Sequence, residues 1–167
     1  MFFQRILHPT DFSELSRAAL HYASELAHDH GARLYILHVV GTLGPENVTY
    51  GEAVSQPQPE TYRKRLWEEI HQVKPDRPDI PVEYILSELG TTEAILQVTV
   101  ERKCDLIVMG SHGRAGLKRF FMGSVAEEVI RKAPCPVLVV KADSPPPRTS
   151  LDRGTELHPQ ELTDQEL

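Results

Sequence analysis

Two short, nearly continuous apolar runs place the tightest limit on the fold. Residues 34–40 combine aliphatic, aromatic and β-branched side chains, and residues 105–109 read Asp-Leu-Ile-Val-Met. A strand with one face in water alternates apolar and polar residues, whereas a parallel strand covered by helices on both faces is apolar almost throughout. The two runs therefore predict parallel strands that lie between layers of helices.

Segments with helical periodicity separate the predicted strands. From Leu15 to Ala27 the apolar residues recur at i, i+3, i+4, i+7 and i+8, which indicates a helix with one buried face. Gly31 follows at the position where helices often end in the left-handed conformation. Three further helices are expected at 60–73, 91–103 and 124–133.

The helix at 91–103 allows two detailed predictions. Thr91 or Thr92 is expected to cap its N-terminus, because a threonine hydroxyl accepts a hydrogen bond from the first free N–H groups. Its periodicity predicts that one apolar face, with Ala94, Ile95 and Val98, points toward the core. Val100 is a further candidate for this buried face.

Strands and helices alternate along the chain. The first strand is expected to end at Pro9, and the strands are predicted at 2–8, 34–40, 82–86, 105–109 and 137–141. This alternation is typical of a parallel sheet with helices on both faces. With 167 residues and no visible repeat, the chain is expected to form one α/β domain over residues 1–141.

Two segments lack a structural period. Residues 41–60 are rich in glycine and proline, and we expect a long mobile loop there. Residues 142–167 form an acidic, proline-rich tail with few apolar side chains to offset the entropy of ordering. We expect this tail to be disordered.

Composition excludes several classes of protein. A net charge of −6 argues against non-specific binding of nucleic acid. No apolar run approaches the roughly 18 residues of a membrane span, and the N-terminal run is too short for a signal peptide. Two cysteines without a CxxC motif leave no disulfide framework. We therefore expect a cytoplasmic protein without nucleic-acid or membrane partners.

A glycine-rich segment after the fourth predicted strand is the candidate for phosphate binding. Gly110, Gly113, Gly123 and Ser124 form the pattern G-x2-G-x9-G-[ST] and lead into a helix. Glycines let the backbone approach an anion, and a helix N-terminus supplies free N–H donors. Residues 101–141 also carry 8 Lys and Arg against 4 Asp and Glu. Simple turn formation by the glycines, and a chance excess of charge, remain the alternatives.

Three stretches resemble the universal stress protein family (UspA-like), in its ATP-binding branch. They are residues 6–13 (Ile-Leu-His-Pro-Thr-Asp-Phe-Ser), residues 37–39 (Leu-His-Val) and residues 109–140, which contain the spaced glycines and end in Pro-Cys-Pro-Val-Leu-Val-Val. The similarity spans roughly residues 2–141 and keeps the whole order of elements.

The resemblance implies a doubly wound, Rossmann-like domain related to the adenine nucleotide alpha hydrolases. It implies a five-stranded parallel sheet of order 3-2-1-4-5 and a homodimer in which the last strand, Val137 to Lys141, pairs across subunits. It also implies ATP as the ligand, with Mg²⁺ or Mn²⁺ bridging the phosphates. Ala126 stands where relatives often have a hydroxyl residue, so one phosphate donor is lost.

The implied nucleotide-binding set follows the ends of three strands and the start of the last helix. Pro9, Thr10, Asp11 and Val39 would line the adenine and ribose pocket, and Met109 would contact the nucleotide. Asp11 is also a candidate metal ligand or a cap of the following helix. The whole set carried over by position is Pro9, Thr10, Asp11, Val39, Met109, Gly110, Ser111, His112, Gly113, Arg114, Gly123, Ser124 and Val125.

These features favour a nucleotide-dependent regulatory or stress-response module. No Ser-His-Asp spacing and no base-plus-nucleophile pair is visible, although slow ATP hydrolysis is compatible with the sequence. Two alternatives stay open. One is an enzyme for adenylyl transfer or ATP hydrolysis, and the other is a dimeric interaction protein with a vestigial site.

Overall fold

A computed structural model describes residues 2–40, 59–111, 122–141, 144–145 and 147 of the chain. The loop expected at 41–60 falls almost entirely outside these residues, as does nearly all of the tail expected at 142–167. Within the described ranges, no helix is long and apolar enough to cross a membrane.

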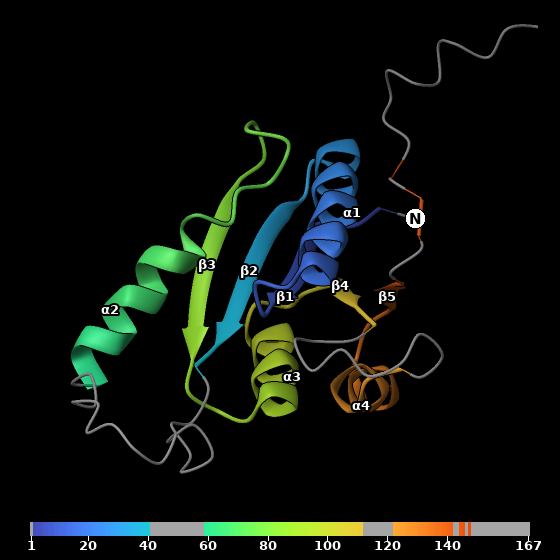
Figure 1. Cartoon of the computed structure of the whole chain (residues 1–167). Helices are drawn as coiled ribbons and strands as arrows, with labels where there is room; N and C mark the ends of the chain where they lie inside the picture. The colour runs from blue at the N-terminus through green and yellow to red at the C-terminus, as the bar shows by residue number, and fades with distance from the viewer. Residues whose placement is uncertain (1, 41–58, 112–121, 142–143, 146, 148–167) are drawn as a thin grey trace, which may run out of the picture.

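Strands and helices alternate strictly, as predicted (Figure 1). Gly31 closes the first helix with a φ of 63°, in the left-handed conformation that glycine adopts without strain. In chain order the elements are β1 (Arg5–Thr10), α1 (Glu14–His30), β2 (Arg33–Val39), α2 (Pro59–Ile70), β3 (Val82–Ser87), α3 (Thr91–Glu101), β4 (Leu106–Gly110), α4 (Ser124–Lys132) and β5 (Val137–Val140).

The strands form one parallel sheet in the order β3-β2-β1-β4-β5, which confirms the predicted topology. The chain runs outward from β1 to β3 on one side and then crosses back to place β4 and β5 on the other. The strand order therefore reverses between β1 and β4, and ligands of open α/β sheets bind at such a reversal.

Helices cover both faces of the sheet. The side chains of Ile6, Ile36 and Val108 pack with the buried stripe of α1. On the other face, Leu7 and Ile107 pack with residues of α3 and α4. Figure 1 shows α2 beyond the edge strand β3, and its Ile70 is fully buried in the α1-side cluster.

The sheet divides at the carboxyl ends of its two central strands. All six residues of β1 pair with β2, but β1 pairs with β4 only through Ile6 and Leu7. β4 stays paired with β5 from Ile107 to Gly110. Beyond Leu7 and Ile107 the sheet therefore consists of two halves, and the division coincides with the reversal of strand order.

Pro9 lies inside β1 rather than at its end, so the predicted boundary of this strand is wrong. Its Cα partner is Leu37 of β2. A proline removes a ladder donor, but it does not interrupt the pairing with β2, because the backbone nitrogen of residue 9 faces the β4 side of the strand. β1 has already parted from β4 at this point, and the strand continues with β2 alone.

Two predictions for α3 are also wrong. Gly90 is the N-cap of the helix and makes no side-chain capping bond, so neither Thr91 nor Thr92 caps it. Val100 is 65% exposed, whereas its neighbour Thr99 is 1% exposed. The Thr99 hydroxyl donates to the Ile95 carbonyl at 2.7 Å, and this bond lets a polar residue occupy the buried face.

Ion pairs fix the segment between α2 and β3 to the outer side of α1. Three acidic or histidine side chains of α1, spaced at i, i+4 and i+7, meet three residues of that segment. In the middle pair, Arg77 donates to both carboxylate oxygens of Glu25 at 2.8 Å, and both side chains are mostly buried. The pairs are His21–Asp76, Glu25–Arg77 and His28–Asp79.

Candidate functional site

The division between β1 and β4 opens at the edge of the sheet where most of the expected binding residues lie. Pro9 and Thr10 end β1, Val39 ends β2, and Met109 and Gly110 end β4. Thr10 and Met109 are buried, whereas Pro9, Val39 and Gly110 are half-buried. The topology thus brings together residues from three strands that are up to 101 positions apart.

The start of α4 is attached to the end of β4. The backbone N–H of Gly123 donates to the Ser111 carbonyl at 2.8 Å, and the N–H of Ser111 donates to the Val140 carbonyl at 2.8 Å. These bonds place Gly123, Ser124 and Val125 beside the carboxyl end of β4. His112, Gly113 and Arg114, which complete the predicted phosphate loop, lie outside the described residues.

The N-terminus of α4 is suited to receive an anion. Gly123 is its N-cap, with φ −66° and ψ 149°, and as a glycine it has no side chain with which to cap the helix. By contrast, the hydroxyl of Ser13 caps α1 by accepting the N–H of Ser16 at 3.1 Å. The first N–H groups of α4 are therefore not bonded by the side chain of their N-cap residue, and they carry the positive end of the helix dipole.

An apolar wall lies next to this helix terminus. Met109 belongs to the cluster that packs under α3 and α4, and Val39 and Val125 pack against this cluster. Pro9 faces the same side, because it pairs with Leu37 of that cluster. Such a wall beside a set of N–H donors offers one surface for a flat apolar ring and another for a charged group.

Buried polar residues gather on the opposite, α1-facing side of the same edge. His8, Thr10, Ser16 and His38 are each at most 8% exposed. The hydroxyl of Ser16 lies 2.7 Å from that of Thr10, and Nδ1 of His38 lies 2.8 Å from the Thr10 carbonyl. Burying polar groups is unfavourable unless they are bonded, so their concentration at this edge marks it as more than a packing region.

Sequence reasoning missed three members of this polar cluster: His8, Ser16 and His38. A signal for two of them was present, because Ile6, His8 and Thr10 alternate on one face of β1, and Leu34, Ile36 and His38 do so on β2. Polar residues thus replace apolar ones on the α1-facing side only at the carboxyl ends of both strands.

His8 is neutral in its buried place. Burial lowers the pKa of His8 from 6.5 to about 4, and the hydrogen bond to the Val108 carbonyl and the nearby charge of Asp11 offset only part of this effect. Its Nδ1 lies 2.9 Å from the Val108 carbonyl oxygen. Because a carbonyl can only accept, Nδ1 carries the ring proton.

The turn between β1 and α1 is built by side chains. The Asp11 carboxylate accepts the N–H of Ser13 at 3.0 Å, so Asp11 shapes the turn while Ser13 caps the helix. Phe12 adopts a φ of 65°, an unusual value for a residue with a Cβ. Its ring packs on that of His38, with ring centres 4.2 Å apart.

The oxygen donors at this edge suit an ion that takes most of its ligands from phosphate. Asp11 supplies one carboxylate, and Thr10, Ser111 and Ser124 add hydroxyl groups. No group of three or more His, Cys, Asp or Glu that could hold a metal ion occurs among the described residues. Mg²⁺ commonly binds through one or two carboxylates together with substrate phosphates.

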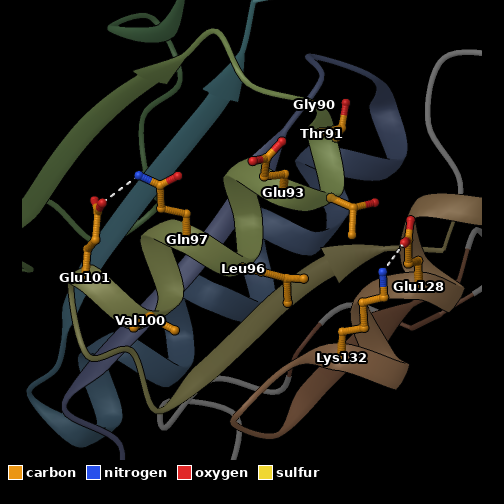
Figure 2. Close-up of a pocket in the computed structure, with 10 residues that line it drawn as sticks. Gly90, Thr91, Glu93, Leu96, Gln97, Val100, Glu101, Glu128 and Lys132 are labelled. Carbon is orange, nitrogen blue, oxygen red and sulfur yellow. Dashed lines mark hydrogen bonds and ion pairs between the residues drawn. The ribbon is translucent and has the colours of Figure 1, made fainter.

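An open groove of about 940 Å³ runs between α3 and α4, away from the divided edge (Figure 2). Leu96 and Val100 line it from α3, and the Glu128–Lys132 ion pair, at 2.6 Å, lines it from α4. Hydrogen bonds from Lys132 and Thr92 lower the pKa of Glu128, which stays ionised. None of the predicted binding residues that the structure describes lines this groove.

Comparison with known proteins gives a consistent match. The model of the universal stress protein family matches residues 2–141. Universal stress protein MJ0531 of Methanocaldococcus jannaschii is 35% identical over 141 residues, covering 83% of this chain and 82% of that protein. The solved structure of the hypothetical protein MJ0577, from the same organism, is 30% identical with a TM-score of 0.68 and covers 87% of this chain and 100% of that one.

A more distant structure contains a nucleotide. The universal stress protein from Archaeoglobus fulgidus, in complex with dAMP, has a TM-score of 0.54 and 24% identity, and covers 84% of this chain and 100% of that one. At this identity the likeness concerns the fold alone.

Proposed function

The chain belongs to the universal stress protein family, and on that premise we propose that it binds ATP at the divided edge between β1 and β4 as a nucleotide-dependent regulatory module. The observation that carries the proposal is the attachment of a helix with a glycine N-cap to the end of β4, at the reversal of strand order. A phosphate chain would be bound by the N–H groups of Gly123, Ser124 and Val125.

The apolar wall supports an adenine base as the other half of the ligand. Pro9, Val39 and Met109 lie on one face of the sheet beside α4 and can cover a flat ring. The same fold holds dAMP in the Archaeoglobus fulgidus protein. Thr10, which ends β1, and Asp11, which follows it, would serve the ribose, with Gly110 and Ser111 next to the phosphates. The remaining phosphate contacts fall to His112, Gly113 and Arg114.

We assign the accompanying metal ion to Mg²⁺ or Mn²⁺. Asp11 is the carboxylate of the described edge that would contribute to it, and the phosphates would supply most other ligands. Ala126, 2% exposed in the first turn of α4, contributes no hydroxyl to the phosphates. We therefore expect binding to depend on backbone donors and on the metal rather than on that position.

A matched pair of glycine substitutions tests this site. Gly123 and Gly90 are both helix N-caps with nearly the same backbone conformation, φ −66° and ψ 149° against φ −59° and ψ 145°. Gly123→Val would place a branched side chain where the phosphates approach, whereas a Cβ at Gly90 meets only the Glu93 carboxylate, at 4.0 Å. Titration with ATP and Mg²⁺ is expected to show binding by the wild type and Gly90→Val but not by Gly123→Val.

The outcome separates the proposal from its alternatives. Equal affinity in a folded Gly123→Val protein would overturn the site. Absence of ATP binding by the wild type at millimolar nucleotide would favour an interaction protein with a vestigial site. Release of phosphate or pyrophosphate at a rate comparable with dedicated enzymes would favour the enzymatic reading.

We also propose a homodimer through β5. This strand pairs with β4 on one side only, and its apolar residues Val137, Leu138 and Val139 are half-exposed. An exposed apolar edge strand readily pairs with another strand. The Val140 and Pro136 carbonyls face β4, so the N–H of Val139 faces outward. Val139→Pro removes that donor without breaking the β4 ladder and is expected to yield monomers in light scattering. An unchanged dimer would refute pairing through β5.

A further inference from the structure

The Val108 carbonyl lies one residue beyond the last β1–β4 pair. The N–H of Asp105 donates to the Arg5 carbonyl at 2.9 Å, whereas the N–H of Arg33 donates to the Gln4 carbonyl at 2.9 Å. Backbone groups alternate in direction along a strand, so odd-numbered residues of β1 face β4 and even-numbered ones face β2.

The same reasoning applies to β4. The N–H groups of Ile107 and Ser111 donate to β5 and its flank, at the carbonyls of Pro136 and Val140. Val108 therefore directs its N–H and carbonyl toward β1. The register pairs Leu7 with Ile107. If this register continues by one more step, the donor to the Val108 carbonyl is the N–H of residue 9.

Residue 9 is proline and has no N–H, so the ladder loses its donor at this point. The side chain of the preceding residue replaces it: Nδ1 of His8 lies 2.9 Å from the Val108 carbonyl oxygen. His8 and Val108 are both completely buried. Without this bond, a buried carbonyl would be left without a partner, which is unfavourable.

The surroundings of His8 allow little adjustment. Its Nε2 has no hydrogen-bond partner among the described residues. The charged group that acts on it is Asp11, from the β1–α1 turn, and His38 of β2 is a further titratable side chain buried on this face. Tyr22 of α1 and Tyr84 of β3 pack against the same cluster, and Glu25 of α1 is paired with Arg77. From α1 the buried residues nearest the turn are Ser16, Ala19 and Leu20, all uncharged.

We propose that His8 is a positioning residue of the nucleotide site, whose Nδ1–H replaces the ladder donor missing at Pro9 and thereby fixes the separation of β1 and β4 at the mouth of the divided edge. This inference rests on the proposed function for its consequence in binding. The geometry of the replaced bond does not depend on a ligand.

The first experiment is a double-mutant cycle on the ligand-free protein. With proline at position 9, His8→Leu is expected to raise the unfolding equilibrium constant about tenfold, because a buried acceptor loses its donor. In the Pro9→Ala background, which restores the N–H, the same substitution is expected to change it less than about threefold. Equal effects in both backgrounds would overturn the proposal.

Amide hydrogen exchange supplies a local measurement in the same samples. The N–H of Val108 faces β1, where the pairing of Leu7 with Ile107 places it against the Leu7 carbonyl, and it is expected to exchange at least about tenfold faster in His8→Leu. The N–H of Met109 faces β5 and serves as the internal control. Unchanged exchange at Val108, or equal acceleration at both residues, would contradict a local role for His8.

The second experiment measures the dissociation constant for ATP with Mg²⁺ in two variants with opposite properties. In His8→Asn the amide nitrogen occupies the place of Nδ1 and keeps the donor, but a cavity remains; in His8→Leu the space is filled and the donor is lost. We expect the dissociation constant of His8→Asn to lie within about threefold of the wild-type value and that of His8→Leu to be about tenfold higher, whichever of the two variants is the more stable. Equal affinities would refute positioning. If the wild type binds no ATP while the cycle shows coupling, the proposed function fails and the role of His8 in the sheet stands.

Discussion

Titration of His8 makes a quantitative prediction about stability against pH. The pKa of His8 falls from 6.5 to about 4 because the ring is buried. Each pKa unit corresponds to about 1.4 kcal/mol, so the preference of the fold for neutral His8 amounts to roughly 3 kcal/mol. Between these two pH values the unfolded chain binds a proton that the folded protein does not. The free energy of unfolding therefore falls as the pH is lowered from about 6.5 to 4.

His8→Leu isolates this contribution. At pH 7.5 the variant is expected to be less stable than the wild type by about 1.4 kcal/mol, which corresponds to the tenfold change in the unfolding equilibrium constant, because the Val108 carbonyl loses its donor. As the pH falls toward 4, titration of His8 lowers the free energy of unfolding of the wild type alone by about 3 kcal/mol. The two stability curves are therefore expected to meet or cross.

Urea denaturation at half-unit intervals of pH, followed by circular dichroism, gives the two curves. Above pH 7 they should run parallel, since the imidazole is then neutral in both the folded and the unfolded wild type. Parallel curves down to pH 4 would show that burial does not keep His8 neutral, and would refute the reasoning.

Three further predictions concern packing, ion pairs and metal. Arg77→Ala should lower the urea midpoint clearly more than Arg131→Ala, because Arg77 binds both oxygens of a mostly buried Glu25 whereas Arg131 belongs to an exposed pair on α4; equal shifts would contradict this. Val98→Ala is expected to destabilise by about 2 kcal/mol in the same assay, and Val100→Ala by less than about 0.5 kcal/mol, since only Val98 is buried. Removal of divalent metal with EDTA should weaken ATP binding at least about tenfold in calorimetric titration while leaving the melting temperature of the ligand-free protein unchanged; undiminished affinity would remove the metal from the site.

The topology was predictable because the signals for it are local and strong. Apolar runs at 34–40 and 105–109, together with helical periods that end at Gly31 or before Pro134, mark each element separately. The alternation of strands and helices then restricts the sheet to parallel pairing. The strand order 3-2-1-4-5 came from the family resemblance, since periodicity alone does not rank neighbouring strands.

The wrong predictions concern residues whose role in the fold depends on neighbours outside their own segment of the sequence. Pro9 predicted a strand end, but the pairing of β1 with β2 does not use the nitrogen of residue 9, and on the β4 side the His8 ring supplies the missing donor. Val100 was a candidate for the core because it is apolar, yet Thr99 takes the buried place by bonding its hydroxyl to the helix backbone. Neither outcome can be read from hydrophobicity along one element.

The candidate site was predictable only in outline. Positions at strand ends, such as Val39 and Met109, follow from the resemblance, and the fold brings them to one edge. His8 and His38 were not found, because a histidine inside an apolar strand resembles any other buried polar residue until its partner is known. Their partners, the carbonyls of Val108 and Thr10, belong to the backbone and leave no trace in the sequence.

β1 and β4 are paired at one end and separate at the other, so the paired end acts as a clamp about which the two strands bend. The clamp is the pairing of Ile6 and Leu7 with β4, and from there β1, which stays paired with β2, extends three further residues to Thr10, or about 10 Å. A rotation of about 6° at the clamp then moves the tip by about 1 Å, the scale on which hydrogen bonds form or fail. Small changes of packing at the base are thus geometrically amplified at the tip, where a ligand would register them.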